Sequence, residues 1–288
     1  MSKSPWIPKK QAATKTEILK SILSIINNRG FQYLINIIHK TKIPIDQMKI
    51  AEIGCGRGVS SLVFALLGAS VTLIDNRKDV LDNAKNIYEA FGCQVSCVQE
   101  DCLEVPSSEL IESFHLVSSY GLAEHFEGED REKCFSYHKH LLKKGGFVNI
   151  ETPNKINLFY WFIRGFCLLI STWDIPFEQA YTNKEFKVIG AKLQFSRVFV
   201  VGITPLHRDA IKYIMGMISA FVLLLPNSLR NNIRLFKHQV QRKVMESKKI
   251  DIRNEIEEKI KQIESKTFRK SILTDYFSWG ISFFGFKD

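Results

Sequence analysis

The chain has 288 residues, of which 45% are apolar and 24% charged; these proportions are ordinary for a globular protein and exclude a chain without a core. The net charge is +10, which favours an anionic partner such as a phospholipid surface, RNA or an acidic metabolite. The six cysteines form no C-x-x-C pair, a pattern that favours reduced thiols in a cytoplasmic protein over a metal site.

Residues 1–48 are expected to precede the main domain. Residues 1–12 are polar and basic and contain two prolines, so we expect a loose arm there. Residues 14–42 have the apolar spacing of two amphipathic helices, broken near Asn27, Asn28 and Gly30.

Residues 49–59, KIAEIGCGRGV, predict a buried strand, a tight turn and the start of a helix. Gly54, Gly56 and Gly58 let the backbone adopt a positive φ and let a ligand approach it, while the helix start offers unpaired N–H groups to an anion. Asp75 ends a second apolar run, VTLID, where an acid meets ribose hydroxyls in a βαβ nucleotide site. The third glycine comes one residue too early for the dinucleotide pattern G-x-G-x-x-G, which argues against a dinucleotide.

The sequence EIGCGRG followed by VTLID resembles motifs I and II of the class I S-adenosylmethionine (SAM) methyltransferases. The resemblance implies that SAM is the cofactor and that Glu52 and the turn hold its methionine end. It also implies that Asp75 accepts hydrogen bonds from the ribose hydroxyls. The residues assigned to this part of the cofactor site are Glu52, Gly54, Cys55, Gly56, Gly58, Asp75 and Asn76.

Strands and helices alternate along the chain after this motif. Strands are expected at 49–53, 71–75, 94–98, 115–120 and 146–152, with helices at 58–68, 77–91, 107–113 and 129–143. A further helix is expected at 182–193, and two closing strands at 195–203 and 277–286. The predicted fold is α/β and Rossmann-like, a mostly parallel seven-stranded sheet with helices on both faces.

Two later segments resemble further motifs of the same family. VQEDCLE implies that Asp101 reaches the adenine amino group and that the Cys102 backbone lies at the ring. FHLVSSYGLAEHF implies that Ser119 and Tyr120 lie beside the cofactor, although His115 stands where the family usually has aspartate.

Glu124 and His125 form an E-H pair similar to that of ubiquinone-type methyltransferases, some of which bind a divalent ion through this pair and an acid three residues earlier. Gly121 occupies that earlier position, so no metal is expected. Glu124 and His125 are the catalytic candidates, with His125 as general base because imidazole titrates in the useful range. A structural hydrogen bond by His125 is the open alternative.

The acceptor side is expected near the end of the fifth strand. LLKKGGFVNIETPNKIN resembles a strand found in methyltransferases that act on lipids, quinones or sugars, which places Glu151 and Asn154 on the acceptor side. Glu178 and Tyr181, just before the next helix, are assigned to the acceptor as well.

A helical insertion is predicted at 205–275, between the catalytic core at 49–204 and a final strand within 276–288. It holds 15 basic and 8 acidic residues. Its first part, Tyr213–Leu229, is uncharged, and a long amphipathic helix is expected at 229–270. Three interpretations remain open: a hairpin packed on the core, peripheral docking on an anionic membrane, and a membrane span. The apolar segment 156–173 either lines an acceptor pocket, dips into a bilayer or covers the sheet.

The predicted function is methyl transfer from SAM to O or N of a hydrophobic or lipid-linked small molecule, in the cytoplasm or at the inner face of a membrane. The alternative acceptor is a soluble sugar or secondary metabolite, with the insertion acting as a lid or as the contact of a homodimer. Nucleic acid is disfavoured because the basic block lacks an evident aromatic platform for stacking bases. A scaffold subunit that binds SAM without turnover is a further alternative, and the sequence does not name the acceptor.

Overall fold

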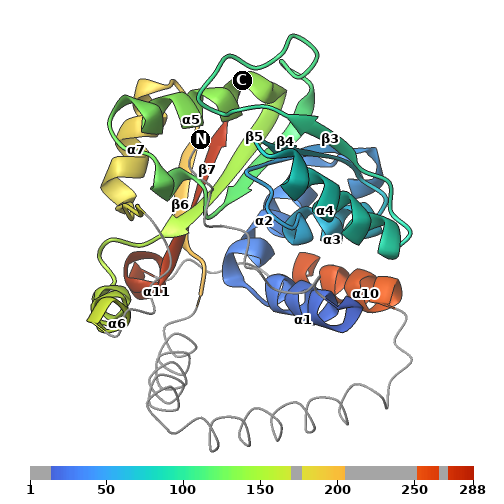
Figure 1. Ribbon diagram of the computed structural model, residues 1–288, viewed down its shortest axis with the longest axis horizontal. Coiled ribbons are helices and arrows are strands. Elements are labelled where there is room, and N and C mark those ends of the chain that lie inside the picture. The colour runs from blue at the N-terminus through green and yellow to red at the C-terminus, as the bar shows by residue number, and fades with distance from the viewer. Residues whose placement is uncertain (1–13, 170–176, 205–251, 266–271) are drawn as a thin grey trace, which may run out of the picture.

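The computed structural model describes residues 14–169, 177–204, 252–265 and 272–288 (Figure 1). The predicted apolar segment Tyr213–Leu229 and most of the predicted helix at 229–270 lie outside these residues. The division of the chain at residues 48, 204 and 275 therefore stays a prediction.

A seven-stranded sheet lies at the centre of the fold, and its strand order is β3-β2-β1-β4-β5-β7-β6. The strands are β1 (Lys49–Ile53), β2 (Ser70–Asp75), β3 (Ser96–Gln99), β4 (Phe114–Tyr120), β5 (Leu142–Pro153), β6 (Val198–Gly202) and β7 (Gly280–Phe286). All pairings are parallel except the two made by β7, which runs antiparallel to β5 and β6. The predicted mostly parallel α/β sheet is confirmed.

The described helices precede, connect and follow these strands. They are α1 (Lys15–Ile26), α2 (Arg29–Thr41), α3 (Val59–Leu66), α4 (Lys78–Ala90), α5 (Glu129–Leu141), α6 (Leu158–Leu169), α7 (Asn183–Lys192), α10 (Ile252–Glu264) and α11 (Ile272–Phe277), with single 3₁₀ turns at Ile45–Gln47 and Ala123–His125. The predicted break between the first two helices is confirmed, because Asn28 caps α2 by accepting hydrogen bonds from the Gly30 and Phe31 amides.

The sheet separates two hydrophobic cores. Successive strand residues point to opposite faces, so Ile50 and Leu73 pack on one face and Ala51 and Ile74 on the other. Helices α1 to α4 and α10 cover the first face, while α5 and α7 cover the second (Figure 1). Helices therefore lie on both faces, as predicted.

Several predicted boundaries are wrong. Residues 107–113 form turns rather than a helix, because Glu112 takes a left-handed φ of 53° and its amide bonds the carbonyl of His140 at the end of α5. Strand β5 begins at Leu142, before the glycine pair, and its pairing with β4 is irregular between Phe114 and Leu116. The last predicted strand, 277–286, is shortened because α11 extends to Phe277.

The described helices between β6 and β7 pack on the main fold. α10 contacts α1 and α2, while α11 contacts β6. Asp275 of α11 forms an ion pair with Arg29 and accepts a hydrogen bond from the Gly202 amide at 3.1 Å. Among the helices that the structure describes, none has the length and apolar content needed to cross a bilayer.

Candidate cofactor and acceptor site

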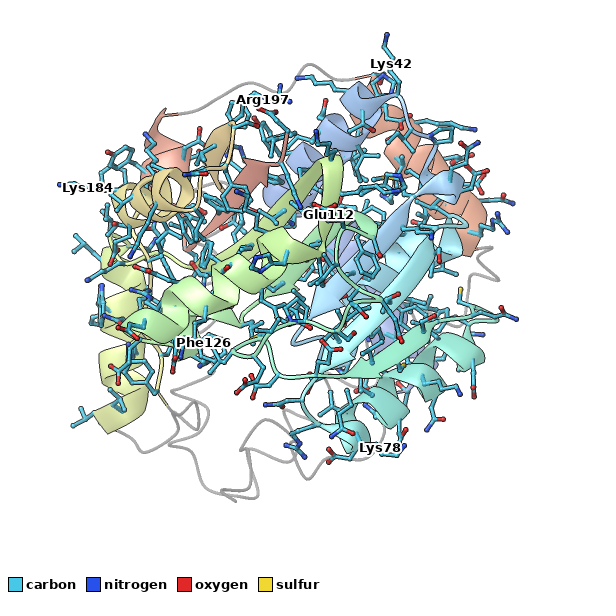
Figure 2. All side chains as sticks on the ribbon, turned by 90° about the horizontal axis from the view of Figure 1, so that it is seen from above. Lys42, Lys78, Glu112, Phe126, Lys184 and Arg197 are labelled. Carbon is cyan, nitrogen blue, oxygen red and sulfur yellow. The ribbon has the colours of Figure 1, made fainter. Side chains whose placement is uncertain are left out.

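A cavity of about 1000 Å³ opens at the carboxyl ends of β1, β2 and β4. Figure 2 locates this edge of the sheet. Lys78 and Phe126 follow the carboxyl ends of β2 and β4 and mark the edge with the cavity. Lys42 and Arg197 precede β1 and β6 and mark the opposite edge. Most of the residues predicted from the sequence line the cavity, namely Glu52, Gly54, Cys55, Gly56, Gly58, Asp75, Asn76, Asp101, Cys102, Tyr120, Glu124, His125 and Glu178. One cavity thus joins the predicted cofactor residues to the predicted catalytic pair.

The glycine turn gives the cavity its floor. Gly54, Gly56 and Gly58 have φ values of 60°, 52° and 64°, a conformation that residues with a side chain rarely adopt. A Cβ on Gly54 would lie 2.7 Å from Leu122 Cδ1, and one on Gly58 would lie 2.8 Å from Leu73 Cδ1. A Cβ on Gly56 would meet nothing within 4 Å, because Gly56 faces the open cavity. The backbone at Gly56 is therefore the part of the turn that a ligand can approach most closely.

Glu52 holds the start of α3 against the sheet. Its Oε2 accepts a hydrogen bond of 3.0 Å from the amide of Ser61, one of the N–H groups that the first turn of a helix leaves free. The side chain is buried, and the loss of hydration raises the pKa of Glu52 to about 7 although the bonds from Ser61 oppose the shift. Its carboxyl group thus lies beneath the turn, at the end predicted to hold the methionine part of SAM.

Two further acids lie at the ends of β2 and β3. Asp75 accepts hydrogen bonds from the amides of Arg77 at 3.1 Å and Gly56 at 3.4 Å, while burial raises its pKa. Asp101 accepts from the Leu103 amide at 3.0 Å and from Asn76 Nδ2 at 3.5 Å. These contacts hold both carboxylates at the wall of the cavity, in the positions that the resemblance assigns to ribose and adenine.

Glu124 is a buried acid in the other lobe of the cavity. Burial, with a smaller contribution from the nearby carboxylate of Glu178, raises its pKa to about 8, so the Glu124 carboxyl is mainly neutral at pH 7. Within the described residues, Oε2 of Glu124 has no hydrogen-bond partner in the protein. A buried polar atom that lines a cavity without a partner is available to a ligand.

His125 is held by the segment in front of α7. Its Nδ1 lies 2.7 Å from the carbonyl oxygen of Phe177. Because a carbonyl oxygen can only accept, Nδ1 carries the proton, and Nε2 of the neutral ring has the lone pair. The same segment is fixed by the Gln179 amide, which donates to the carbonyl of Glu124 at 2.7 Å.

Glu178 and Tyr160 bring a third segment to this lobe. The Tyr160 hydroxyl donates to Glu178 Oε1 at 2.6 Å, and Arg164 donates to the Glu178 carbonyl at 3.1 Å. The Trp279 ring packs edge-on against Tyr160, with centroids 5.5 Å apart, and both line the cavity. This lobe therefore combines aromatic walls with carboxyl groups.

Four predicted site residues do not line the cavity. Ser119 is buried, with its hydroxyl 2.9 Å from His138 Nε2. Glu151 accepts a hydrogen bond from Ser282 at 3.2 Å, beside Gly30 of α2. Asn154 donates to the carbonyls of Tyr276 and Ser278, and the Tyr181 hydroxyl donates to Ala123 at 3.1 Å. Each of these four side chains forms hydrogen bonds within the fold.

Sequence reasoning missed several residues of the lining. Ser21 and Ile25 of α1, Phe126, Tyr160 and Trp279 all line the cavity. Only Phe126 had a local signal, since it directly follows the Glu124–His125 pair. Among the described residues, no group of three or more His, Cys, Asp or Glu side chains is arranged to hold a metal ion.

Part of the chain is similar to known methyltransferases. Residues 50–146 match the family model described as a methyltransferase domain. The chain is similar to the ubiquinone biosynthesis O-methyltransferases of Rickettsia prowazekii (strain Madrid E), 26% identical over 141 residues, and of Pelagibacter ubique (strain HTCC1062), 32% identical over 128 residues. These matches cover 49% and 42% of this chain and 54% and 50% of the relatives. The chain thus spans about half the length of the curated relatives it matches.

Solved structures with a similar chain course include a SAM-dependent methyltransferase from Archaeoglobus fulgidus, 16% identical, with a TM-score of 0.47 over 88% of this chain and 93% of that one. Another is a sarcosine dimethylglycine methyltransferase homologue from Galdieria sulphuraria, 13% identical, with a TM-score of 0.49 over 95% of this chain and 85% of that one.

The sheet order and the glycine turn at the end of β1 define a Rossmann-like nucleotide-binding protein. Within that class, residues 50–146 match the methyltransferase domain model, which supports the predicted resemblance to the class I SAM-dependent methyltransferases. The residues present fit SAM: Gly56 leaves the floor of the cavity open, and Asp75 and Asp101 lie at its wall.

Substituting Gly56 with alanine is expected to weaken SAM binding by at least about tenfold, because the added methyl group projects into the ligand space. Gly92→Ala is a matched control: Gly92 also has a positive φ, 70°, and open space at its Cβ, but lies outside this cavity. Both variants should lose similar stability, about 1 kcal/mol. Calorimetric titration with SAM measures the difference, and equal affinities in the two variants would contradict the placement of the ligand.

The pKa of Glu124 predicts how stability depends on pH. The unfolded carboxyl ionises near pH 4.5 and the folded one near 8, so unfolding releases a proton between these values and stability falls as pH rises through this window. The slope from this group is at most about 1.4 kcal/mol per pH unit. Glu124→Gln should therefore gain stability relative to the parent at pH 8 but not at pH 4. Urea unfolding at both values checks this, and a difference independent of pH would refute it.

Proposed function

We propose that the protein transfers a methyl group from SAM to an oxygen atom of a hydrophobic small molecule, and that it does so at the surface of a membrane. The observation that carries the proposal is the single cavity in which the glycine turn and Asp75 share one space with Glu124, His125 and an aromatic wall. When bound, SAM supplies a methyl group on a positively charged sulfur, which is a good leaving group. The protein then has to position the acceptor and remove its proton.

His125 is the general base in this proposal. The bond to the Phe177 carbonyl fixes the proton on Nδ1 and leaves the Nε2 lone pair to take the acceptor proton. Glu124, neutral at pH 7, can donate a hydrogen bond to an acceptor oxygen without placing a second negative charge next to Glu178. The aromatic rings of Tyr160 and Trp279 suit a flat, apolar acceptor.

The similarity to ubiquinone biosynthesis O-methyltransferases favours oxygen over nitrogen as the accepting atom, and a quinone-type ring as the acceptor. Such an acceptor agrees with the mixture of apolar surface and a few polar groups in this lobe.

An exposed apolar surface near the acceptor lobe supports action at a membrane. On α6, Leu158 and Leu169 are each 81% exposed, and Phe162 is 58% exposed. Phe277 of α11 and Phe177 of the segment that holds His125 are also largely exposed. α6 and α11 lie side by side (Figure 1), and Asn157 Nδ2 bonds the Phe277 carbonyl at 2.7 Å. Exposed apolar side chains gathered beside the site, together with a basic chain, suit the interface of an anionic membrane, so we place the protein peripherally at the inner face.

His125→Asn tests the base. An asparagine amide can still donate to the Phe177 carbonyl but cannot take a proton, so kcat should fall by about 10²- to 10⁴-fold while SAM affinity stays within about twofold. The assay follows methyl transfer to a hydroxyl-bearing quinol in detergent micelles, with calorimetry for SAM. His140→Asn, an exposed residue of α5 that does not line the cavity, serves as the control. A His125→Asn enzyme with nearly full kcat would exclude His125 as the base.

Vesicle sedimentation tests the membrane surface. The protein should bind vesicles that contain about 30 mol% phosphatidylglycerol and should be released by salt, which screens charge. The double substitution Phe162→Ser and Leu169→Ser should lower the bound fraction about fivefold, because it removes apolar contact with the bilayer. Val188→Ser, an exposed residue on α7, should leave binding unchanged. If the parent chain does not bind vesicles, or if the double variant binds as well as the parent, membrane docking is refuted. The soluble-acceptor alternative would then remain.

A further inference from the structure

Helix α10 lies between β6 and β7 in the sequence. It packs on α1, which borders the cofactor end of the cavity. Its apolar residues recur at three- and four-residue steps: Ile256, Ile260 and Ile263 are 0%, 4% and 7% exposed. They belong to the same core cluster as the buried isoleucines of α1, and α10 contacts both α1 and α2. Figure 1 shows α10 alongside α1, on the side of the fold away from α5 and α7.

Helix α1 has two adjacent stripes with different neighbours. Ile18, Ile22 and Ile26, spaced four residues apart, are buried in the core that α10 completes. Ser21 and Ile25, on the neighbouring stripe, line the cavity at the end where the glycine turn lies. The helix also packs on α3, which starts directly after that turn. A displacement of α1 would therefore change the wall of the cofactor end of the cavity.

Apolar packing is the main means by which α1 is held. The helix has 12 residues, and a helix of that length is marginal without tertiary contacts. Its capping box, Thr14 with Glu17, stabilises the helix itself but does not attach it to the rest of the protein. Lys15 Nζ of α1 donates a hydrogen bond of 3.2 Å to the Ala90 carbonyl of α4, but this bond is exposed to solvent.

We propose that α10 is a working part of the cofactor site: Ile256 and Ile260 hold α1 in the position in which Ser21 and Ile25 close the cavity beside the glycine turn. They are positioning residues, because they line no part of the cavity and act through α1. The inference rests on the proposed function in one respect, which is that SAM occupies this end. It makes cofactor affinity depend on a segment outside the matched methyltransferase domain, residues 50–146.

The experiment compares the full-length protein with the double variant Ile256→Ala and Ile260→Ala. SAM affinity, measured by calorimetry, should fall about tenfold, whereas kcat at saturating SAM should stay within about twofold, because the acceptor lobe is unchanged. Hydrogen exchange of the amides of residues 15–26 gives a second readout. SAM should slow this exchange in the parent and have little effect in the variant.

Two controls separate positioning from general loss of stability. Ile150→Ala makes, at one residue, the same truncation in the core on the opposite face of the sheet, and it should lower the unfolding midpoint without changing SAM affinity. Ile260→Val, which keeps most of the packing, should restore affinity to within about twofold of the parent and remains informative if the double variant does not fold.

The outcomes distinguish the two proposals. Absence of SAM binding by the parent would refute the proposed function itself. If the parent binds SAM and the α10 variant binds equally well, or if Ile150→Ala weakens binding as much, the role of α10 is overturned. A selective loss of affinity in the α10 variant, together with loss of SAM-dependent protection in α1, supports it.

Discussion

The hydrogen bond from the Ser61 amide to the buried carboxyl of Glu52 is the contact on which the site depends. It ties the first turn of α3 to the end of β1, so the five residues between them have to turn back sharply. Glycines at 54, 56 and 58 favour these positive φ values, and a Cβ at Gly54 or Gly58 would clash with Leu122 or Leu73. The same turn brings the Gly56 amide to Asp75, which connects β1 to the end of β2. The cofactor end of the cavity thus follows from one short, local piece of chain.

The sequence could predict the site residues that lie near strand ends, but not those that come together from segments far apart in the chain. The glycine turn, Asp75, Asp101 and the Glu124–His125 pair lie at the end of a strand or within a few residues after it, and parallel strands bring their carboxyl ends to one edge. Tyr160, Glu178 and Trp279 come from three separate segments, and no short-range pattern indicates that they meet. Glu178 was predicted as an acceptor residue, but its partner Tyr160 was seen only as part of an apolar segment.

Strand faces and local hydrogen bonds explain the residues that lie elsewhere. A strand ending predicts that a residue is near the site, but alternate side chains point to opposite faces, and the sequence does not say which face the acceptor uses. Glu151 pairs across the sheet with Tyr120 and Ser282, and its carboxyl bonds Ser282 on the side of α2. Ser119 lies one residue before Tyr120 and points the other way, to His138 of α5. For Ser119 the prediction did not resolve the face, whereas Glu151 lies on the face of its register partner Tyr120 and its carboxyl is held by Ser282.

The two lobes of the cavity use carboxyl groups in different ways. At the cofactor end, Asp75 and Asp101 accept hydrogen bonds from neighbouring groups, which holds them in place as acceptors. At the acceptor end, Glu124 is buried beside Glu178, and two anions so close would repel each other. Keeping Glu124 neutral removes that repulsion and leaves a hydrogen-bond donor next to His125, the base in the proposed reaction. In the proposed reaction, this donor and this base would meet an acceptor hydroxyl as it loses its proton, which is why we propose oxygen methylation over a site that only binds SAM.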